Sequence, residues 1–156
     1  MGELVSIVYK PVDEAAAEDG YTRIPLQEAR LVVGHGIEGD SKGAATRQLN
    51  LMAAGTIQTL ANEGFTSAPG ELGEQLIVAN VDIDSLPAGA RLAIGQSACI
   101  EVTEPRTGCG KFERYQGKRK EEACGRLGQM ARVVTGGMIR IGDPVRLVAD
   151  EHASKE

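Results

Sequence analysis

The amino-acid sequence predicts a mainly β fold, an antiparallel β-barrel with a few short helices, which belongs to a β-rich α+β class. Apolar residues occur in short alternating runs, as in half-buried strands, rather than at sustained helical spacing. Glycine contributes 20 of the 156 residues, about twice the average share of ~7 %, which favours many turns between short strands. The runs follow one another without a regular βαβ alternation, so we expect a mostly antiparallel sheet that closes on itself.

The first half of the chain is expected to hold three strands and one helix. The strands span residues 4–9, 24–33 and 48–52, with polar segments at 12–20 and 34–46 between them. In the third strand, Leu49 and Leu51 share one face, so Asn50 points to the opposite face. Apolar residues at helical spacing follow, and Gly64 supplies a C-terminal stop for this helix.

The second half continues the β pattern around one charged segment. Strands are expected at 76–78, 92–94, 98–102, 133–134, 139–141 and 145–148. Two of them form a hairpin across Gly95–Gln96, and the same pattern of strand, glycine turn and strand recurs around Gly142. Phe112–Leu127 is predicted to be helical. The polar tail 150–156 is expected to be disordered, which leaves 1–149 as a single domain.

The composition and net charge argue against several classes of function. A net charge of −5 argues against a broad nucleic-acid surface. The chain shows no signal-peptide pattern and no run of the ~20 apolar residues that a membrane span needs. The three cysteines lack paired spacing, which fits a reducing compartment, so a cytoplasmic location without membrane or nucleic-acid partners is expected. Cys99 should face away from the apolar side of its strand and Cys124 should sit in a helix core, so neither is assigned a function.

One cysteine carries the strongest chemical signal. Cys109 lies between Gly108 and Gly110, which let the backbone bend and let a ligand approach the sulfur. Arg106 and Lys111 flank it, and nearby cations favour the thiolate, the form that attacks electrophiles and binds soft metals. We therefore predict that Cys109 is a catalytic or metal-binding thiol, the alternative being a small buried residue in a tight turn.

Other motifs match known sites less well. Gly34–Gly39 fits G-x-G-x-x-G, but a polar segment follows where a dinucleotide fold needs an apolar helix. Gly108–Phe112 resembles the end of a P-loop, but Pro105 replaces the first glycine and Phe112 replaces the Ser or Thr that holds magnesium. The cysteines lack the C-x-x-C spacing of a structural zinc site, and cysteine or serine hydrolase chemistry would leave only His35 as a base.

Six short motifs occur in order along residues 4–148. They are Gly36–Asp40 (GIEGD), Arg47–Leu51 (RQLNL), Gly70–Leu76 (GELGEQL), Leu86–Gly95 (LPAGARLAIG), Pro105–Cys109 (PRTGC) and Gly136–Asp143 (GGMIRIGD). In this order they resemble the MOSC domain, the C-terminal domain of molybdenum-cofactor sulfurases and its stand-alone relatives. Each motif alone is weak, whereas six in the family's order are specific.

The resemblance implies a β-rich barrel that binds the molybdenum cofactor (molybdopterin). It aligns the family cysteine with Cys109, which in the family is proposed to carry sulfur or to ligate molybdenum. Longer relatives, including the amidoxime-reducing proteins, carry an additional N-terminal domain for which this chain has no room. The chain is therefore similar to short stand-alone members, with sulfur transfer or the reduction of N-hydroxylated compounds as the expected roles. Partners would be molybdopterin or a small-molecule substrate, and molybdenum-cofactor enzymes or a redox partner.

Two other functions stay open at this point. In the first, the chain is a non-catalytic cofactor carrier or chaperone in which Cys109 only tethers the ligand. In the second, the barrel is an interaction module without a cofactor. Whether the protein is an enzyme, as a sulfur transferase or a molybdenum-dependent oxidoreductase, is left open with them.

Basic and polar residues near the motifs are the candidates for binding the cofactor. The planar guanidinium of Arg47 suits a phosphate or a pterin carbonyl, the alternative being a solvated strand edge. Asn50 would hydrogen-bond the pterin, and His35 either contacts an anion or stabilises its loop. Glu71 and Glu74 are candidate acid–base groups that turn solvation explains equally well. The full set of cofactor-binding candidates is Arg47, Lys42, Arg106, Lys111, Asn50, His35 and Arg132.

Overall fold

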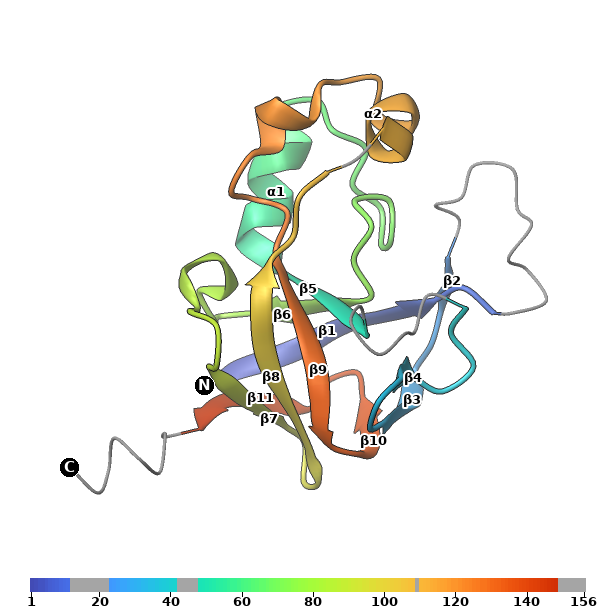
Figure 1. The fold of residues 1–156 in the computed structure, drawn as a ribbon, viewed down its shortest axis with the longest axis vertical. Helices are drawn as coiled ribbons and strands as arrows, with labels where there is room; N and C mark the ends of the chain where they lie inside the picture. Colours follow the sequence, from blue (N-terminus) through green and yellow to red (C-terminus); the bar gives the residue numbers. More distant parts are fainter. Residues whose placement is uncertain (12–22, 42–47, 109, 149–156) are drawn as a thin grey trace.

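Seven strands close into a barrel in the computed structural model, which describes residues 1–11, 23–41, 48–108 and 110–148 (Figure 1). The strands are β1 (Gly2–Tyr9), β5 (Leu49–Ala53), β6 (Leu76–Ala79), β7 (Arg91–Ile94), β8 (Ala98–Pro105), β9 (Gln129–Thr135) and β11 (Pro144–Val148). Their order is β11-β7-β8-β9-β5-β6-β1, and β1 closes the ring by pairing with β11, where Gly2 lies opposite Val145. The short strand β2 (Ile24–Pro25) pairs with the other end of β1. The predicted β-barrel with few short helices is therefore confirmed.

One pair in the ring departs from the antiparallel expectation. β5 and β6 run parallel, with Leu51 opposite Leu76. A parallel pair needs a crossover connection, and the chain between these strands contains α1 (Ala54–Asn62). Gly64 adopts a φ of +97° directly after α1, so the predicted glycine stop of this helix is confirmed.

A second sheet lies beside the barrel. It has three strands in the order β10-β3-β4, which span Gly137–Arg140, Glu28–Val32 and Gly36–Ile37. The single strand expected at 24–33 is therefore wrong, because β2 and β3 belong to different sheets. The predicted hairpin across Gly95–Gln96 is confirmed, with Ile94 opposite Ala98. The similar pattern around Gly142 is no hairpin, because β10 pairs with β3 while β11 pairs with β7 and β1.

Helix α1 and the helical segments within residues 110–123 lie at one end of the barrel (Figure 1). The continuous helix predicted at 112–127 is wrong: α2 spans Gly110–Gln116, and a separate 3-10 helix, η3, spans Lys120–Ala123. Gly117, with a φ of +67°, ends α2. Another 3-10 helix, η2 (Ile83–Ser85), precedes β7. None of the helices in the described ranges is long and apolar enough to cross a membrane.

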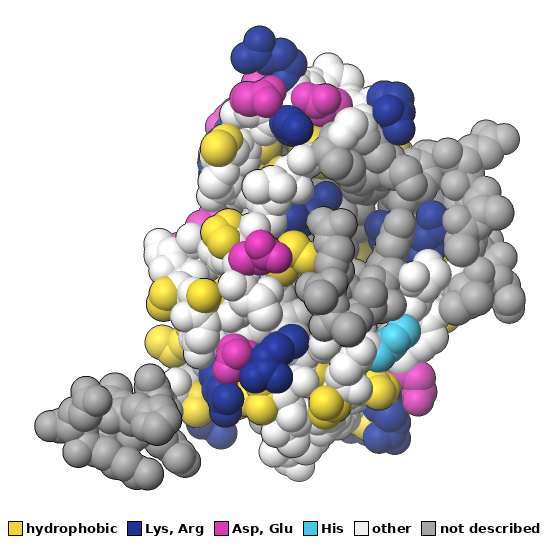
Figure 2. Space-filling view, in the orientation of Figure 1, with side chains coloured by type: hydrophobic (Ala, Val, Ile, Leu, Met, Phe, Trp, Pro, Cys, Tyr) yellow, Lys and Arg dark blue, Asp and Glu magenta, His cyan; other side chains and the backbone are white. Residues whose placement is uncertain are grey.

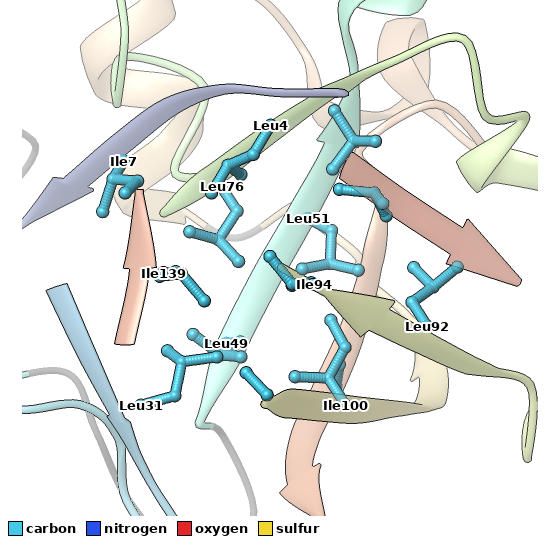
Figure 3. Packing of buried hydrophobic residues seen from close by; sticks show 14 of the residues in the cluster. Leu4, Ile7, Leu31, Leu49, Leu51, Leu76, Leu92, Ile94, Ile100 and Ile139 are labelled. Carbon is cyan, nitrogen blue, oxygen red and sulfur yellow. The ribbon is translucent and has the colours of Figure 1, made fainter. Parts of the chain in front are cut away.

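Two apolar clusters hold these parts together. The first fills the barrel, where side chains from several strands, such as Leu4, Leu51 and Ile100, point toward one another (Figure 3). The second, under the helices, consists of Met52, Leu60, Phe65, Leu72, Phe112, Ala123 and Leu127. Burial of each large apolar side chain contributes roughly 1.5–3 kcal/mol. β5 is buried on both faces because Leu51 points into the barrel while Met52 packs under the helices.

The predicted domain limits stay a prediction. Residues 149–156, which include the expected boundary and the tail, lie outside the described part of the chain.

Candidate functional site

Three predicted site residues, Cys109, Lys42 and Arg47, lie outside the described residues. Lys111 lies in α2, and its side chain is likewise not described. The described side chains next to these positions therefore define the candidate site.

A buried polar network holds the chain on both sides of residues 42–47. The backbone N–H of Lys10 donates to Oδ1 of Asp40 at 3.2 Å, and Nε2 of Gln75 donates to Oδ2 of Asp40 at 3.3 Å. Oε1 of Gln75 in turn accepts the backbone N–H of Asn50 at 2.8 Å. All four side chains are buried. The segment that carries two predicted cofactor ligands therefore starts and ends close to residues that are fixed by one network.

The turn at residues 70–74 brings a buried carboxylate next to this network. Gly70 and Gly73 have φ values of +89° and +92°, a backbone conformation that favours glycine. Oε2 of Glu74 accepts the backbone N–H of Gly70 at 2.6 Å, and the Glu74 side chain is 1 % exposed. Burial raises the pKa of Glu74 and outweighs the backbone hydrogen bonds and the charge of Arg106, which act in the opposite direction.

Two buried oxygens at this turn have no hydrogen-bond partner among the described residues. They are Oδ1 of Asn50 and Oε1 of Glu74. Nδ2 of Asn50 donates to the carbonyl of Gly73 at 3.4 Å, so both side chains meet the same turn. A buried acceptor left without a partner costs about 1–3 kcal/mol. A water molecule or a ligand N–H or O–H group is therefore expected at these oxygens.

Arg106 joins the turn to the segment that contains Cys109. Its Nη1 donates to the carbonyl of Leu72. Its Cζ lies 5.8 Å from the centroid of the Phe112 ring, within the range of a cation–π contact. The absence of a side chain at Gly73 gives the guanidinium its room, because a Cβ there would lie 2.6 Å from Cζ. The cation is therefore held in place three residues before Cys109.

A cavity of about 360 Å³ opens between residues 106–108 and the η3 segment. Its size is within the range of small-molecule sites, roughly 300–1,000 Å³. The lining includes two cations, an apolar floor and a thiol, contributed by Arg106, Lys120, Ala123, Leu127 and Cys124. Figure 2 shows Lys and Arg side chains in a hollow near the middle of one face.

Cys124 corrects one expectation from the sequence. It is exposed and lines this cavity, whereas the sequence placed it in a helix core. The charged segment breaks at Gly117, and Cys124 follows the short η3 turn instead of continuing a helix. Sequence reasoning also missed Lys120, which lines this cavity together with Gly108, a residue 12 positions earlier in the chain. No local pattern signals such a contact.

His35 and Arg132 are two further candidates from the sequence. His35 lies in the turn between β3 and β4 of the second sheet. Arg132 is exposed on β9, where its Nε donates to Oε2 of Glu101 at 3.1 Å. Neither residue lines the cavity beside Arg106.

The remaining described surface offers a weaker alternative. A cavity of about 450 Å³ opens where β5 and β6 end and α1 begins, and its lining contains no Lys, Arg, His or Cys. No group of three His, Cys, Asp or Glu side chains within the described ranges could hold a metal ion.

Comparisons with known proteins identify the family and agree with the fold. The sequence profile described as MOSC domain matches residues 38–146. Similar solved structures include YiiM from Geobacillus stearothermophilus, at 19% identity and a TM-score of 0.73, which covers 96% of this chain and 76% of that chain. YiiM from Escherichia coli matches at 22% identity with a TM-score of 0.69, over 95% of this chain and 70% of that chain. The YuaD protein from Bacillus subtilis matches at 16% identity with a TM-score of 0.74, over 93% of this chain and 94% of that chain. At these identities the structural likeness establishes the fold. No curated protein sequence matches the chain significantly.

Proposed function

Because the chain belongs to the MOSC domain family, whose members bind the molybdenum cofactor, we propose that it binds this molybdopterin-type ligand at the helical end of the barrel. We further propose that Cys109 acts there in sulfur transfer to molybdenum. The observation that supports the proposal most is the turn at Leu72–Gly73, which the guanidinium of Arg106 contacts. At the same turn, Oδ1 of Asn50 and Oε1 of Glu74 are buried without a hydrogen-bond partner among the described residues.

The described residues fit such a ligand. The positive charge and planar shape of the Arg106 guanidinium suit a phosphate group or a carbonyl. Oδ1 of Asn50 and Oε1 of Glu74, which no other described residue hydrogen-bonds, suit the N–H groups of a pterin ring. Gly73 presents no Cβ, and the guanidinium of Arg106 occupies the space that this leaves beside the turn.

The other residues have complementary roles in this proposal. Cys109 carries sulfur as a persulfide or ligates molybdenum through its thiolate, because soft metals favour sulfur ligands. Lys42, Arg47 and Lys111 supply further positive charge for the phosphate. His35 and Arg132 are not used in this proposal, because neither lines the cavity beside Arg106.

When bound, the cofactor supplies a molybdenum centre that can take up a sulfur ligand or pass electrons to an N-hydroxylated compound. The chain itself binds the anionic part, orients the ring and presents a thiol. A cytoplasmic location is part of the proposal, since reactive free thiols persist under reducing conditions.

Purification from a cofactor-producing host, beside the same host blocked in cofactor synthesis, tests the proposal. Molybdenum by mass spectrometry and pterin by fluorescence after oxidation are expected only in the first preparation. A folded, cofactor-free protein from the competent host would overturn it. The Cys109→Ser variant then separates the mechanisms. If the thiol is only a tether, the variant keeps most of its pterin. If the thiol carries sulfur, the variant keeps its pterin but forms no persulfide, and if the thiol ligates molybdenum, the variant loses the metal.

A further inference from the structure

The η3 segment forms one wall of the cavity beside Arg106, and hydrogen bonds fix this wall on both sides. At the start of η3, the backbone N–H of Lys120 donates to Oε2 of Glu113 at 2.9 Å. Beyond its end, the guanidinium of Arg126 donates to both carboxylate oxygens of Glu63, at 2.6 and 2.9 Å. A bidentate pair of this kind also fixes orientation, so the wall is held in place by its own contacts.

The opposite wall and the floor of the cavity are closely packed. A Cβ added to Gly108 would lie 2.9 Å from Cβ of Lys120 and 3.1 Å from Cδ2 of Phe112, so the backbone at Gly108 lies close to both. Ala123 and Leu127, which form the floor, belong to the apolar cluster under the helices. An apolar ligand body would therefore meet side chains that are already fixed, and its binding would order few further groups.

The charge of the cavity is opposite to that of the whole chain. Its lining holds Arg106 and Lys120 against one carboxylate, Glu121, whereas the chain has a net charge of −5. Among the described residues, no acidic side chain forms an ion pair with the ammonium of Lys120. A local excess of positive charge attracts anions, so this lining favours an anionic ligand.

The size of the excess favours a ligand with one negative charge. Two cations and one carboxylate in the lining leave a single positive charge. A carboxylate matches it better than a phosphate monoester, which carries about −1.5 to −2 at neutral pH. A second negative charge on the ligand would also be repelled by Glu121. The ammonium of Lys120 presents three N–H donors, which suit a carboxylate oxygen.

We infer that this cavity binds a small organic carboxylate with an apolar body, whose carboxylate lies at Lys120 and Arg106 and whose body lies against the apolar floor. Lys120 is the residue that selects the charge of this ligand. The inference goes beyond the proposed function, because it concerns a second ligand in a cavity whose lining includes neither Asn50 nor Glu74.

Titration of the full chain, purified from the cofactor-producing host, with benzoate tests this site at neutral pH and constant ionic strength. The backbone amide signals of residues 106–108 and 120–127 in ¹⁵N NMR spectra are expected to shift and to saturate. Benzamide, which has the same ring without the charge, should bind at least about tenfold more weakly, and benzylammonium more weakly still. Acetate should also bind at least about tenfold more weakly, because it lacks the apolar body.

Two substitutions with effects of opposite sign locate the charge. Lys120→Gln is expected to weaken benzoate binding at least about fivefold, because a cation is lost. Glu121→Gln is expected to strengthen it about two- to threefold, because the one carboxylate of the lining is removed. Lys118→Gln is the matched control and should bind benzoate like the wild type, because the ammonium of Lys118 lies over the Phe65 ring, 5.3 Å from its centroid, and outside the lining. Circular dichroism checks the fold of the three variants.

Three results would overturn the inference. One is that benzamide binds as tightly as benzoate, and another is that the Lys120→Gln and Lys118→Gln proteins lose affinity equally. The third is that phenyl phosphate, titrated in parallel, binds in preference to benzoate, which would exclude a carboxylate as the ligand.

The pterin content of the same preparations separates this inference from the proposed function. Unchanged pterin in the Lys120→Gln protein supports a separate site, whereas loss of pterin together with benzoate affinity would assign the cavity to the cofactor and overturn the inference. If the wild type holds no pterin but binds benzoate in a manner that depends on Lys120, the proposed function fails and the carboxylate site stands.

Discussion

The guanidinium of Arg106 lies directly against the backbone of Gly73. A Cβ at position 73 would lie 2.6 Å from Cζ of Arg106, and the φ of Gly73 is +92°. Lack of space and a left-handed backbone therefore both disfavour a side chain at this position. Because Arg106 also donates to the carbonyl of Leu72, the turn and the guanidinium hold each other in place.

Gly73→Ala is expected to destabilise the fold by about 2–4 kcal/mol, the sum of backbone strain and a steric clash. Gly89→Ala is the matched control, because Gly89 has a φ of +94° and nothing within 4 Å of the added Cβ. It should cost only the strain, about 1–2 kcal/mol. Urea denaturation of both variants measures the difference. Equal losses would show that Arg106 yields freely to the new methyl group.

Arg106→Gln is expected to lower the affinity for pterin at least tenfold, since a hydrogen bond to a charged group contributes about 1.5–3 kcal/mol. Arg106→Lys should recover part of the loss, because it keeps the charge but not the planar donor pair. Arg140→Gln is the control, because Arg140 is ion-paired with Glu28 on the second sheet. Equilibrium dialysis and the pterin content of purified protein report the effect. A similar loss in the Arg140 variant would point to a general charge effect instead.

Local patterns predicted the parts of the fold that neighbours in sequence determine. The β7–β8 hairpin follows from one glycine turn, and the end of α1 follows from Gly64. The parallel β5–β6 pair escaped prediction because its partners are joined by a helix and a long loop. The supposed helix at 112–127 failed at Gly117, whose positive φ separates α2 from η3.

In the candidate site, too, local features could be predicted from the sequence and long-range contacts could not. Strand alternation placed Asn50 opposite Leu49 and Leu51, and the structure agrees, with both leucines in the barrel cluster. That Asn50 meets Gly73 could not be predicted, because the two are 23 residues apart and are brought together by the barrel. The convergence of Arg106 on the same turn is another such long-range contact.

Asn50→Leu is expected to lower the pterin content of the protein while leaving its free energy of unfolding nearly unchanged. The change removes a buried oxygen without a partner among the described residues and one long hydrogen bond to Gly73. These effects have opposite signs, so the free energy of unfolding should change by less than about 1 kcal/mol. Pterin content should nevertheless fall, because the oxygen that receives a ring N–H is gone. Asn62→Leu, at an exposed position in α1, should leave the pterin content unchanged. A large loss of stability with unchanged pterin would give Asn50 a purely structural role.

Glu74 is expected to make the stability of the protein depend on pH. Burial raises the pKa of this carboxyl above its ordinary value of 4.5, so the folded state binds the proton more tightly than the unfolded chain does. Below the ordinary value both states are protonated, and the stabilisation from the bound proton is fully present. As the pH rises from about 4.5 through the raised pKa, this stabilisation is lost, because ionisation of a buried carboxylate is unfavourable.

Glu74→Gln should therefore flatten the stability profile in that window, while its amide oxygen can still accept the N–H of Gly70. Glu63→Gln gives a control of opposite sign, because the hydrogen bond from Arg126 lowers the pKa of Glu63. The contribution of Glu63 is present above its ordinary pKa and is lost as the pH falls. Urea denaturation at a series of pH values measures both slopes. The prediction fails if the wild type and the Glu74→Gln protein lose stability in parallel above pH 4.5. That result would mean that the Glu74 carboxylate is hydrated or paired, so that its buried oxygen is not available to a ligand.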